Sequence, residues 1–210
     1  MTILFDLDGT LIDSTEAILE SFQVAFETFG KKAPQAHVIK SQIGHPLDVM
    51  FSYMGIEDTQ VDQYVDAYKK HYRVISKEKT ILLPDAKEAI ELASTHATLG
   101  IVTTKTGLYS KELLEHMGVM HYFSVLIGRE DVTHPKPHPE PVLKALSKLD
   151  SDKTACWMIG DTPMDIAAAN AAAIESVAVT CGYASKAELL EYGCNIVPNA
   201  YEAVKFIIES

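Results

Sequence analysis

The sequence predicts an α/β protein with a doubly wound parallel sheet and a helical-bundle domain inserted after the first strand. Three observations support this prediction. An apolar run at residues 3–7 opens the chain as a buried strand. Helical periodicity then continues without a strand to about residue 77. From residue 80, strands and helices alternate, which is typical of a parallel sheet covered by helices on both faces.

The first strand carries two carboxylates, Asp6 and Asp8, where a buried strand should carry none, and Gly9 breaks it. Residues two apart on an extended chain point the same way, so these acids leave the strand side by side. Like charges at such spacing are costly unless a cation or a proton holds them. Two acids capping a turn in water are the simpler interpretation. The preceding apolar strand favours a binding site, because ligands of doubly wound proteins lie at the carboxyl ends of strands.

The helical stretch that follows the first strand, up to about residue 77, is typical of a small helical bundle. Its periodicity predicts four helices. The first covers residues 15–29, a shorter one starts near residue 36, the third covers residues 46–54, and the fourth starts at a cap at Thr59 and ends at about residue 77. Tyr64, Tyr68 and Tyr72 share one helical face and are expected in the core of the bundle.

The remainder of the chain completes the sheet. Strands are expected at residues 98–103, 123–127, 155–159, 176–180 and 195–197, and helices at 84–93, 108–117, 139–149, 164–172, 186–192 and 200–208. Because the first strand must join this sheet across the bundle, residues 1–13 and 81–210 are expected to form one domain. Residues 14–80 would form the other.

Composition excludes several classes of protein. The 210 residues carry a formal net charge of −11 and 47% hydrophobic residues, so a large core can form and the basic footprint of a nucleic-acid binder is absent. An anionic substrate would need local positive charge. The odd number of cysteines, with apolar neighbours at Cys156, Cys181 and Cys194, indicates reduced thiols in a cytoplasmic protein. No apolar run approaches a membrane span, and a strand at residue 2 leaves no room for a signal peptide.

Polar side chains follow each of four expected strands. They are Asp6 and Asp8; Thr103, Thr104 and Lys105; Lys136 within HPKPHPEP; and Asp161 and Asp165 after Gly160. Carboxylates are hard oxygen ligands that suit Mg²⁺, and lysine offers a charge for an anion. Together they predict a site that moves a phosphoryl group, where catalysis is mainly positioning and charge neutralisation.

The segments FDLDGT, VTTK, HPKPHPEP and GDTPMD resemble the four motifs of the haloacid dehalogenase superfamily. The helical insert, residues 14–80, resembles the alpha-helical cap of that superfamily. The IGHPL segment and Gly182-Tyr183 are most similar to the phosphoglycolate phosphatase and pyrophosphatase branch. The resemblance implies a Rossmann-like core, a cap and a Mg²⁺-dependent phosphatase.

The resemblance also implies roles for the acids. Asp6 would be the nucleophile that forms an aspartyl-phosphate, and Asp8 the general acid and base. Mg²⁺ would be held by the Asp6 side chain, the Asp8 backbone carbonyl and Asp161. Asp165 would act through water or behind the ligands. The presence of Asp8 implies a phosphatase rather than a dehalogenase.

Substrate contacts are implied as well. Thr103 and the amide of Thr104 would hold phosphoryl oxygens, and Lys136 would offset charge between Asp6 and the phosphate. Lys105 either contacts the substrate or supports its loop. In the cap, Gly44 and His45 lie in a break between helices where relatives place substrate-selecting residues, and His45 either faces the substrate or does not.

Two positions depart from the family pattern. Thr104 stands where relatives often have Asn, and Ala173 where many have Gly. If the latter position needs a positive φ, alanine costs about 1 kcal/mol.

His134 and His138 flank Lys136 and suggest a metal site, but hydrogen bonding within a rigid loop is the favoured interpretation.

The expected function is Mg²⁺-dependent hydrolysis of a small phosphorylated metabolite, a phosphoglycolate-type phosphomonoester. Inorganic pyrophosphate hydrolysis and a β-phosphoglucomutase-like phosphomutase are the alternatives. A non-catalytic binding module is disfavoured because all the expected acids are present. A lid over the site favours small soluble substrates. The sequence leaves open the substrate and whether the protein is a monomer or a homodimer.

Overall fold

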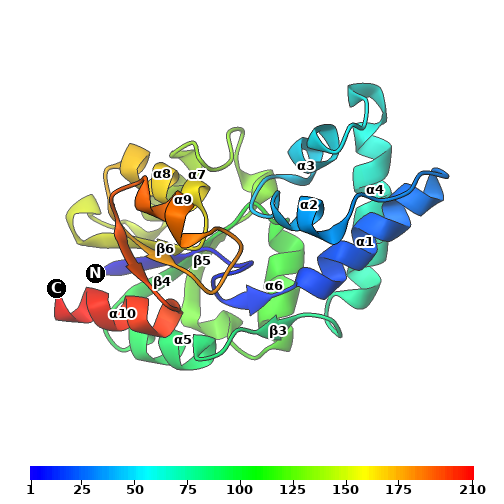
Figure 1. The fold of residues 1–210 in the computed structure, drawn as a ribbon. Coiled ribbons are helices and arrows are strands. Elements are labelled where there is room, and N and C mark those ends of the chain that lie inside the picture. Colours follow the sequence, from blue (N-terminus) through cyan, green and yellow to red (C-terminus); the bar gives the residue numbers. More distant parts are fainter. The chain divides into compact units, whose positions relative to one another are not determined.

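The computed structural model describes residues 1–210, and the chain divides into two compact units. The larger unit contains residues 1–13 and 82–210, and the smaller, helical unit contains residues 14–81 (Figure 1). We describe each unit by itself.

The larger unit is built on a six-stranded parallel sheet, which confirms the predicted fold class. The strands lie in the order β5-β4-β1-β6-β7-β8. Their bounds are β1 Thr2–Phe5, β4 Thr98–Val102, β5 Phe123–Ile127, β6 Cys156–Gly160, β7 Glu175–Val179 and β8 Asn195–Val197. β1 lies between β4 and β6, so residues distant in sequence meet at its carboxyl end.

β1 is apolar throughout because both faces of the sheet are covered. Ile3 and Phe5 pack into one cluster with Ile90 and Val204, whereas Leu4 packs into another with Val142. All three β1 residues are fully buried. Alternate residues of the strand therefore anchor two separate layers of helices.

The helices of the larger unit cover both faces (Figure 1). α5 (Ala86–Ser94) and α10 (Ala200–Glu209) pack on each other and on one face, and α7 (Glu140–Leu149) and α8 (Pro163–Ala172) pack together on the other. The remaining helices are α6 Gly107–His116, α9 Lys186–Leu190 and the 3₁₀ turns η1 Met120–Tyr122, η2 Arg129–Asp131 and η3 Lys153–Ala155.

α8 ends in a left-handed residue. Ala173 has φ 58°, and the following amide, of Ile174, donates to Ala169 O at 3.1 Å. The side chain of Ala173 is exposed. Glycine adopts this conformation without cost, so the backbone of Ala173, at a position where many family members have glycine, is strained.

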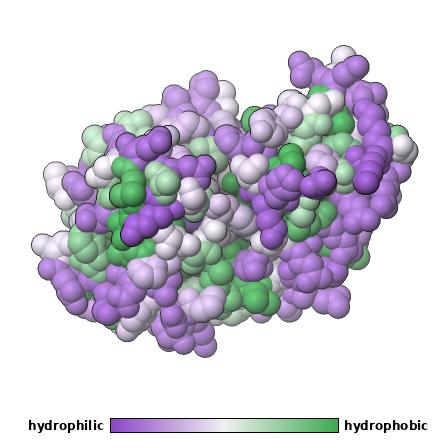
Figure 2. Space-filling model, in the orientation of Figure 1, coloured by the Kyte–Doolittle hydropathy of each residue, from purple (hydrophilic) through white to green (hydrophobic).

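The smaller unit contains α1 (Thr15–Thr28), α2 (Ala36–Lys40), α3 (Leu47–Tyr53) and α4 (Asp58–Ile75). α4 begins at Asp58 with Glu57 as its N-cap, so the expected cap at Thr59 is wrong by two residues. Phe22 forms the centre of an aromatic core, with ring centroids 4.7 Å from Phe51 and 4.9 Å from Tyr68. The three-tyrosine stripe is buried, as predicted. On the face seen in Figure 2, hydrophilic side chains cover most of this unit.

Two short strands, β2 (Ile12–Asp13) and β3 (Ile81–Leu82), form a second sheet that the sequence did not predict. A strand of two residues is too short to show the alternation of buried and exposed side chains that predicts a strand.

None of the helices combines the length and the apolar character needed to cross a membrane. The cysteines are unpaired, with Cys156 buried and the other two half-buried.

Candidate active site

Asp6 follows β1 directly and continues its hydrogen-bond ladder. The backbone amide of Asp6 donates to Ile159 O in β6 at 2.9 Å, which fixes where the carboxylate leaves the sheet. The side chain is buried. The turn after it needs Gly9, which has φ +84°; a Cβ there would lie 2.3 Å from Oδ2 of Asp161. The first loop therefore approaches the acid at the end of β6 as closely as backbone can.

Lys136 reaches Asp6 from the loop between η2 and α7. Its side chain is 3% exposed. Its Nζ donates to Asp6 Oδ1 at 2.7 Å, to Asp165 Oδ1 at 2.5 Å and to the backbone oxygen of Val102 at 2.9 Å. The ammonium group thus uses all three hydrogens, two of them on buried carboxylates.

Asp161 lies at the carboxyl end of β6 and is fully buried. Its Oδ1 accepts a hydrogen bond from the Thr10 hydroxyl at 3.1 Å, and its Oδ2 accepts one from the Tyr183 amide at 2.8 Å. A Cβ at Gly182 would stand 2.0 Å from Oδ2. Glycine is therefore required for the loop after β7 to reach this carboxylate.

Asp165 lies in the first turn of α8 and is also fully buried. Its Oδ2 accepts from the Thr162 amide at 3.0 Å and from the Thr162 hydroxyl at 2.7 Å, while its Oδ1 accepts from Lys136. Because one oxygen binds the ammonium group of Lys136 and the other binds Thr162 at the start of α8, Asp165 is suited to hold Lys136 and to support the site from behind.

Asp8 is half-buried and pairs with Lys105. The Nζ of Lys105 lies 3.1 Å from Oδ1 and 2.9 Å from Oδ2 of Asp8. The backbone amide of Lys105 donates to the hydroxyl oxygen of Thr103 at 3.2 Å. Thr103 is buried at the end of β4, and Thr104 beside it is half-buried. The strand-end segment 103–105 therefore contacts the first-strand loop through its lysine.

Burial and like charges shape the electrostatics of the acids. Burial is the main reason that the pKa of Asp6 is raised to about 7, and Asp165 and Asp8 add to this effect while Lys136 opposes it. The pKa of Asp161 is raised well above its ordinary value by burial and by the charges of Asp6 and Asp165. Burial lowers the pKa of Lys136, but the two carboxylates outweigh it and raise the pKa overall. Three buried acids facing one ammonium favour a further cation.

The same three acids provide the oxygen ligands that a further cation would need. Carboxyl oxygens of Asp6, Asp161 and Asp165 lie within 4.8 Å of one another. Carboxylates at this spacing suit a hard divalent cation such as Mg²⁺, which binds a few protein oxygens and keeps several waters.

Gly44 and His45 belong to the helical unit, in the turn between α2 and α3. Gly44 has φ +108°. Burial lowers the pKa of the half-buried His45 imidazole. Their contact with a substrate stays a prediction.

The sequence did not identify several donors that hold the acids in place. Thr162 lies three residues before Asp165, a spacing typical of a capping box, and this could have indicated their contact. No local pattern indicates that Thr10 and the amide of Tyr183 bind Asp161, because those contacts join segments 151 and 22 residues apart.

Comparison with known proteins gives the family. Residues 3–179 match the model of the haloacid dehalogenase-like hydrolase family, which is most of the chain. Among curated relatives, pyrophosphatase PpaX of Oceanobacillus iheyensis is 35% identical over 179 residues, covering 85% of this chain and 82% of that protein. The phosphoglycolate phosphatase of Yersinia pestis is 31% identical over 188 residues, covering 86% and 81%.

A solved structure has the same fold. The haloacid dehalogenase-like family protein SP0104 of Streptococcus pneumoniae superposes with a TM-score of 0.88 at 27% identity, covering 98% of this chain and 97% of that one. The resemblance inferred from the four motifs is thereby confirmed, and the chain belongs to the haloacid dehalogenase-like hydrolase family.

Proposed function

We propose that this protein is a cytoplasmic, Mg²⁺-dependent phosphatase that hydrolyses a phosphoglycolate-type phosphomonoester through an aspartyl-phosphate on Asp6. One observation carries the proposal: a buried lysine binds Asp6 and Asp165 while the carboxylate of Asp161 lies within reach of the same point. A carboxylate nucleophile, a fixed positive charge and a cation-binding pair of acids are the parts that phosphoryl transfer needs.

In the first step, Asp6 attacks phosphorus. Its Oδ1 is held by Lys136, so Oδ2 is the oxygen available to form the new bond. The bond from phosphorus to the ester oxygen breaks, and Asp8 gives that oxygen a proton. In the second step water attacks the phosphorus of the acyl phosphate, Asp8 takes the water's proton, and the carboxylate of Asp6 leaves. The sum is one ester and one water converted to alcohol and phosphate.

The remaining core residues bind and neutralise. Thr103 and the amide of Thr104 would donate to phosphoryl oxygens, and Lys136 would reduce the repulsion between the phosphate and Asp6. Mg²⁺ when bound would supply positive charge to those oxygens. Asp6, Asp161 and the backbone carbonyl of Asp8 would hold it, with Asp165 acting through water.

We assign residues 14–80 the role of a cap that selects the substrate, with Gly44 and His45 as its substrate-facing residues. The partner is a small phosphorylated metabolite, and the protein is a monomer or a homodimer. Phosphoglycolate is proposed as substrate because several relatives are phosphoglycolate phosphatases at 31% identity. The 35% identity to PpaX favours inorganic pyrophosphate as the second candidate.

A substrate panel tests the proposal. Phosphoglycolate, pyrophosphate, nucleoside monophosphates and hexose phosphates are each incubated with the enzyme, with Mg²⁺ or with a chelator, and free phosphate is measured. We expect release from phosphoglycolate that needs Mg²⁺ and is lost in Asp6→Asn. Release that survives chelation, or that Asp6→Asn leaves unchanged, would remove the basis of the mechanism. A phosphomutase would instead need a bisphosphate activator and release little phosphate.

A further inference from the structure

Lys136 has a buried side chain on a loop that is otherwise exposed or half-buried. The loop runs from residue 133 to 139, and the imidazoles of His134 and His138 on either side of Lys136 are exposed. Lysine has a long flexible stem. A backbone that is held on both sides of Lys136 therefore helps to keep its Nζ at 2.7 Å from Asp6.

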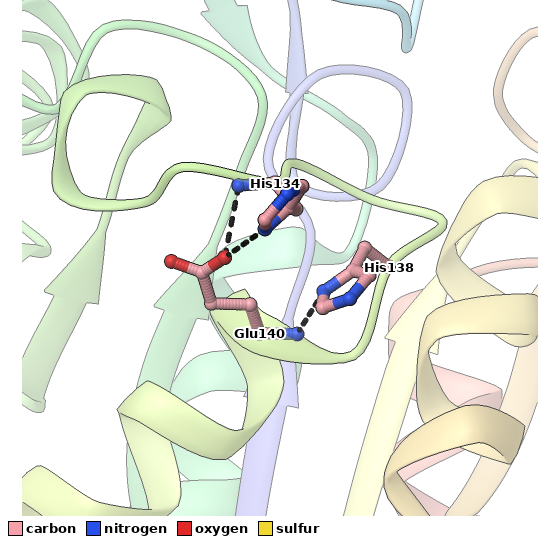
Figure 3. Close-up of side chains that lie close together, drawn as sticks. All are labelled: His134, His138 and Glu140. Atoms are coloured by element: carbon pink, nitrogen blue, oxygen red, sulfur yellow. Dashed lines mark hydrogen bonds and ion pairs between the residues drawn. The ribbon is translucent and has the colours of Figure 1, made fainter.

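Glu140, the first residue of α7, provides that hold (Figure 3). One carboxylate oxygen accepts from the Thr133 amide at 2.8 Å. The other lies 2.9 Å from both the amide and the Nδ1 of His134. The amide of Glu140 in turn donates to Nδ1 of His138 at 3.1 Å. Residues before and after Lys136 are thus tied to the start of one helix. We call this set, Thr133, His134, His138 and Glu140, the Glu140 clamp.

Ligand atoms of the two imidazoles and of the carboxylate in the clamp lie within 4.8 Å of one another. Both oxygens of Glu140 accept from the loop, and Nδ1 of His138 accepts from a backbone amide. The protein's own donors therefore engage this group, and the role we assign to it is to hold the loop. The amides of Thr133 and His134 lower the pKa of Glu140 to about 2 because they bind its charged form, and hydrogen bonds to a charged carboxylate are in general stronger than those to a neutral acceptor.

We infer that Glu140 is a positioning residue for the reaction: it fixes the loop backbone around Lys136 and so keeps Nζ on Asp6 and Asp165. The inference rests on the proposed function, in which Lys136 offsets charge between Asp6 and the phosphate. Glu140 itself contacts only loop residues 133, 134 and 138 through the bonds described, so its effect on catalysis passes through Lys136.

Chemical labelling of Lys136 tests the clamp without any reaction. Native protein is pulsed with acetic anhydride, and acetylation of the Lys136 peptide is followed by mass spectrometry, with exposed lysines as internal references. We expect Glu140→Ala to raise the Lys136 rate by about tenfold or more, and Glu140→Gln, which retains one acceptor oxygen, by less. A thermal unfolding curve of each variant serves as the control that it is folded at the labelling temperature. An unchanged Lys136 rate in folded Glu140→Ala would overturn the inference.

Asp152 supplies a matched control. Its carboxylate accepts a hydrogen bond from the Thr154 amide at 3.0 Å, in a loop before η3. That loop lies at the start of β6, the end opposite to Asp161. Asp152→Asn should leave the Lys136 labelling rate and the activity unchanged. A rate raised as much as in Glu140→Ala would show that any weakened loop exposes Lys136, and would contradict a specific clamp.

A double-mutant cycle connects the clamp to catalysis. Glu140→Ala should lower kcat for phosphate release by about tenfold in the parent enzyme, but by less than about twofold in Lys136→Ala, where its partner is gone. Equal losses in both backgrounds would mean that Glu140 acts independently of Lys136. A parent enzyme that releases no phosphate would contradict the proposed function, and the labelling result would still decide whether Glu140 positions Lys136.

Discussion

Nζ of Lys136 lies 2.7 Å from Oδ1 of Asp6, although 130 residues separate them in the chain. The same nitrogen binds Asp165 in the first turn of α8. One buried ammonium therefore joins the end of β1, the loop before α7 and the start of α8. We expect both stability and activity to depend on this contact.

Replacing Lys136 with Met should affect both properties. Removing one partner leaves two buried carboxylates without their cation, which costs about 3–5 kcal/mol in the free energy of unfolding. Urea unfolding in the presence of a chelator measures this loss. Phosphate release should fall by a factor on the order of 10² or more. Lys111→Met is the control, because its exposed pair with Glu115, at 3.8 Å, should contribute less than about 0.5 kcal/mol. Equal effects of the two variants would contradict the role of the buried contact.

Gly9→Ala should abolish activity because the new Cβ would lie 2.3 Å from the carboxylate of Asp161. Gly118 is the matched control: it also has a positive φ, +73°, but nothing lies within 4 Å of its Cβ position. Gly118→Ala should cost about 1 kcal/mol in stability and leave phosphate release intact. Comparing Mg²⁺ dependence and activity of the two variants separates backbone strain from displacement of Asp161. Full activity in Gly9→Ala would refute the close approach.

Lys105→Ala tests the pair with Asp8. The lysine contacts both oxygens of that carboxylate, so its loss should let the side chain of Asp8 move and lower kcat by about tenfold. Asp8→Asn, which removes the proposed acid and base, should cost about 10²–10⁴. Steady-state phosphate release gives both values. Equal losses would assign Lys105 a direct role in the reaction, and no loss would leave its contact without a function.

Ala173→Gly should stabilise the protein by about 1 kcal/mol. Ala173 has φ 58° and an exposed side chain, so glycine relieves strain without removing packing. Ala171→Gly, also exposed and within α8, should have the opposite sign because helical φ favours alanine. Thermal or urea unfolding compares the pair. A destabilised Ala173→Gly would show that flexibility of the unfolded chain outweighs the relief of strain.

Glu140 should make stability depend on acid pH. Its pKa is lowered from 4.5 to about 2 by the amides of Thr133 and His134, so its ionised form stabilises the fold above pH 4.5. This contribution is lost as the pH falls from 4.5 through 2. Glu140→Gln should therefore lower Tm at pH 7, and the difference from the parent should shrink below pH 4.5. The exposed Glu115→Gln is the control, and a difference independent of pH would contradict the assignment.

Much of the architecture could be predicted because it depends on local pattern. β1 is apolar at Ile3, Leu4 and Phe5 because both faces are covered, and a two-sided strand shows in sequence as a continuous apolar run. The parallel alternation and the buried tyrosine stripe of the helical unit follow from equally local arguments, whereas the strain at Ala173 was expected only from the family pattern. The pair β2 and β3 could not be predicted, since two-residue strands carry no period.

By itself, the sequence determined the family and the residue types at the strand ends, because carboxylates after apolar strands leave a pattern that no core position explains. Only the tertiary structure decided how those residues are paired. Lys136 binds Asp165 as well as Asp6, Lys105 binds Asp8, and Glu140 holds the loop. The physical reason is that hydrogen bonds depend on positions in space, and these partners, from distant segments or around a loop, meet only once the chain has folded.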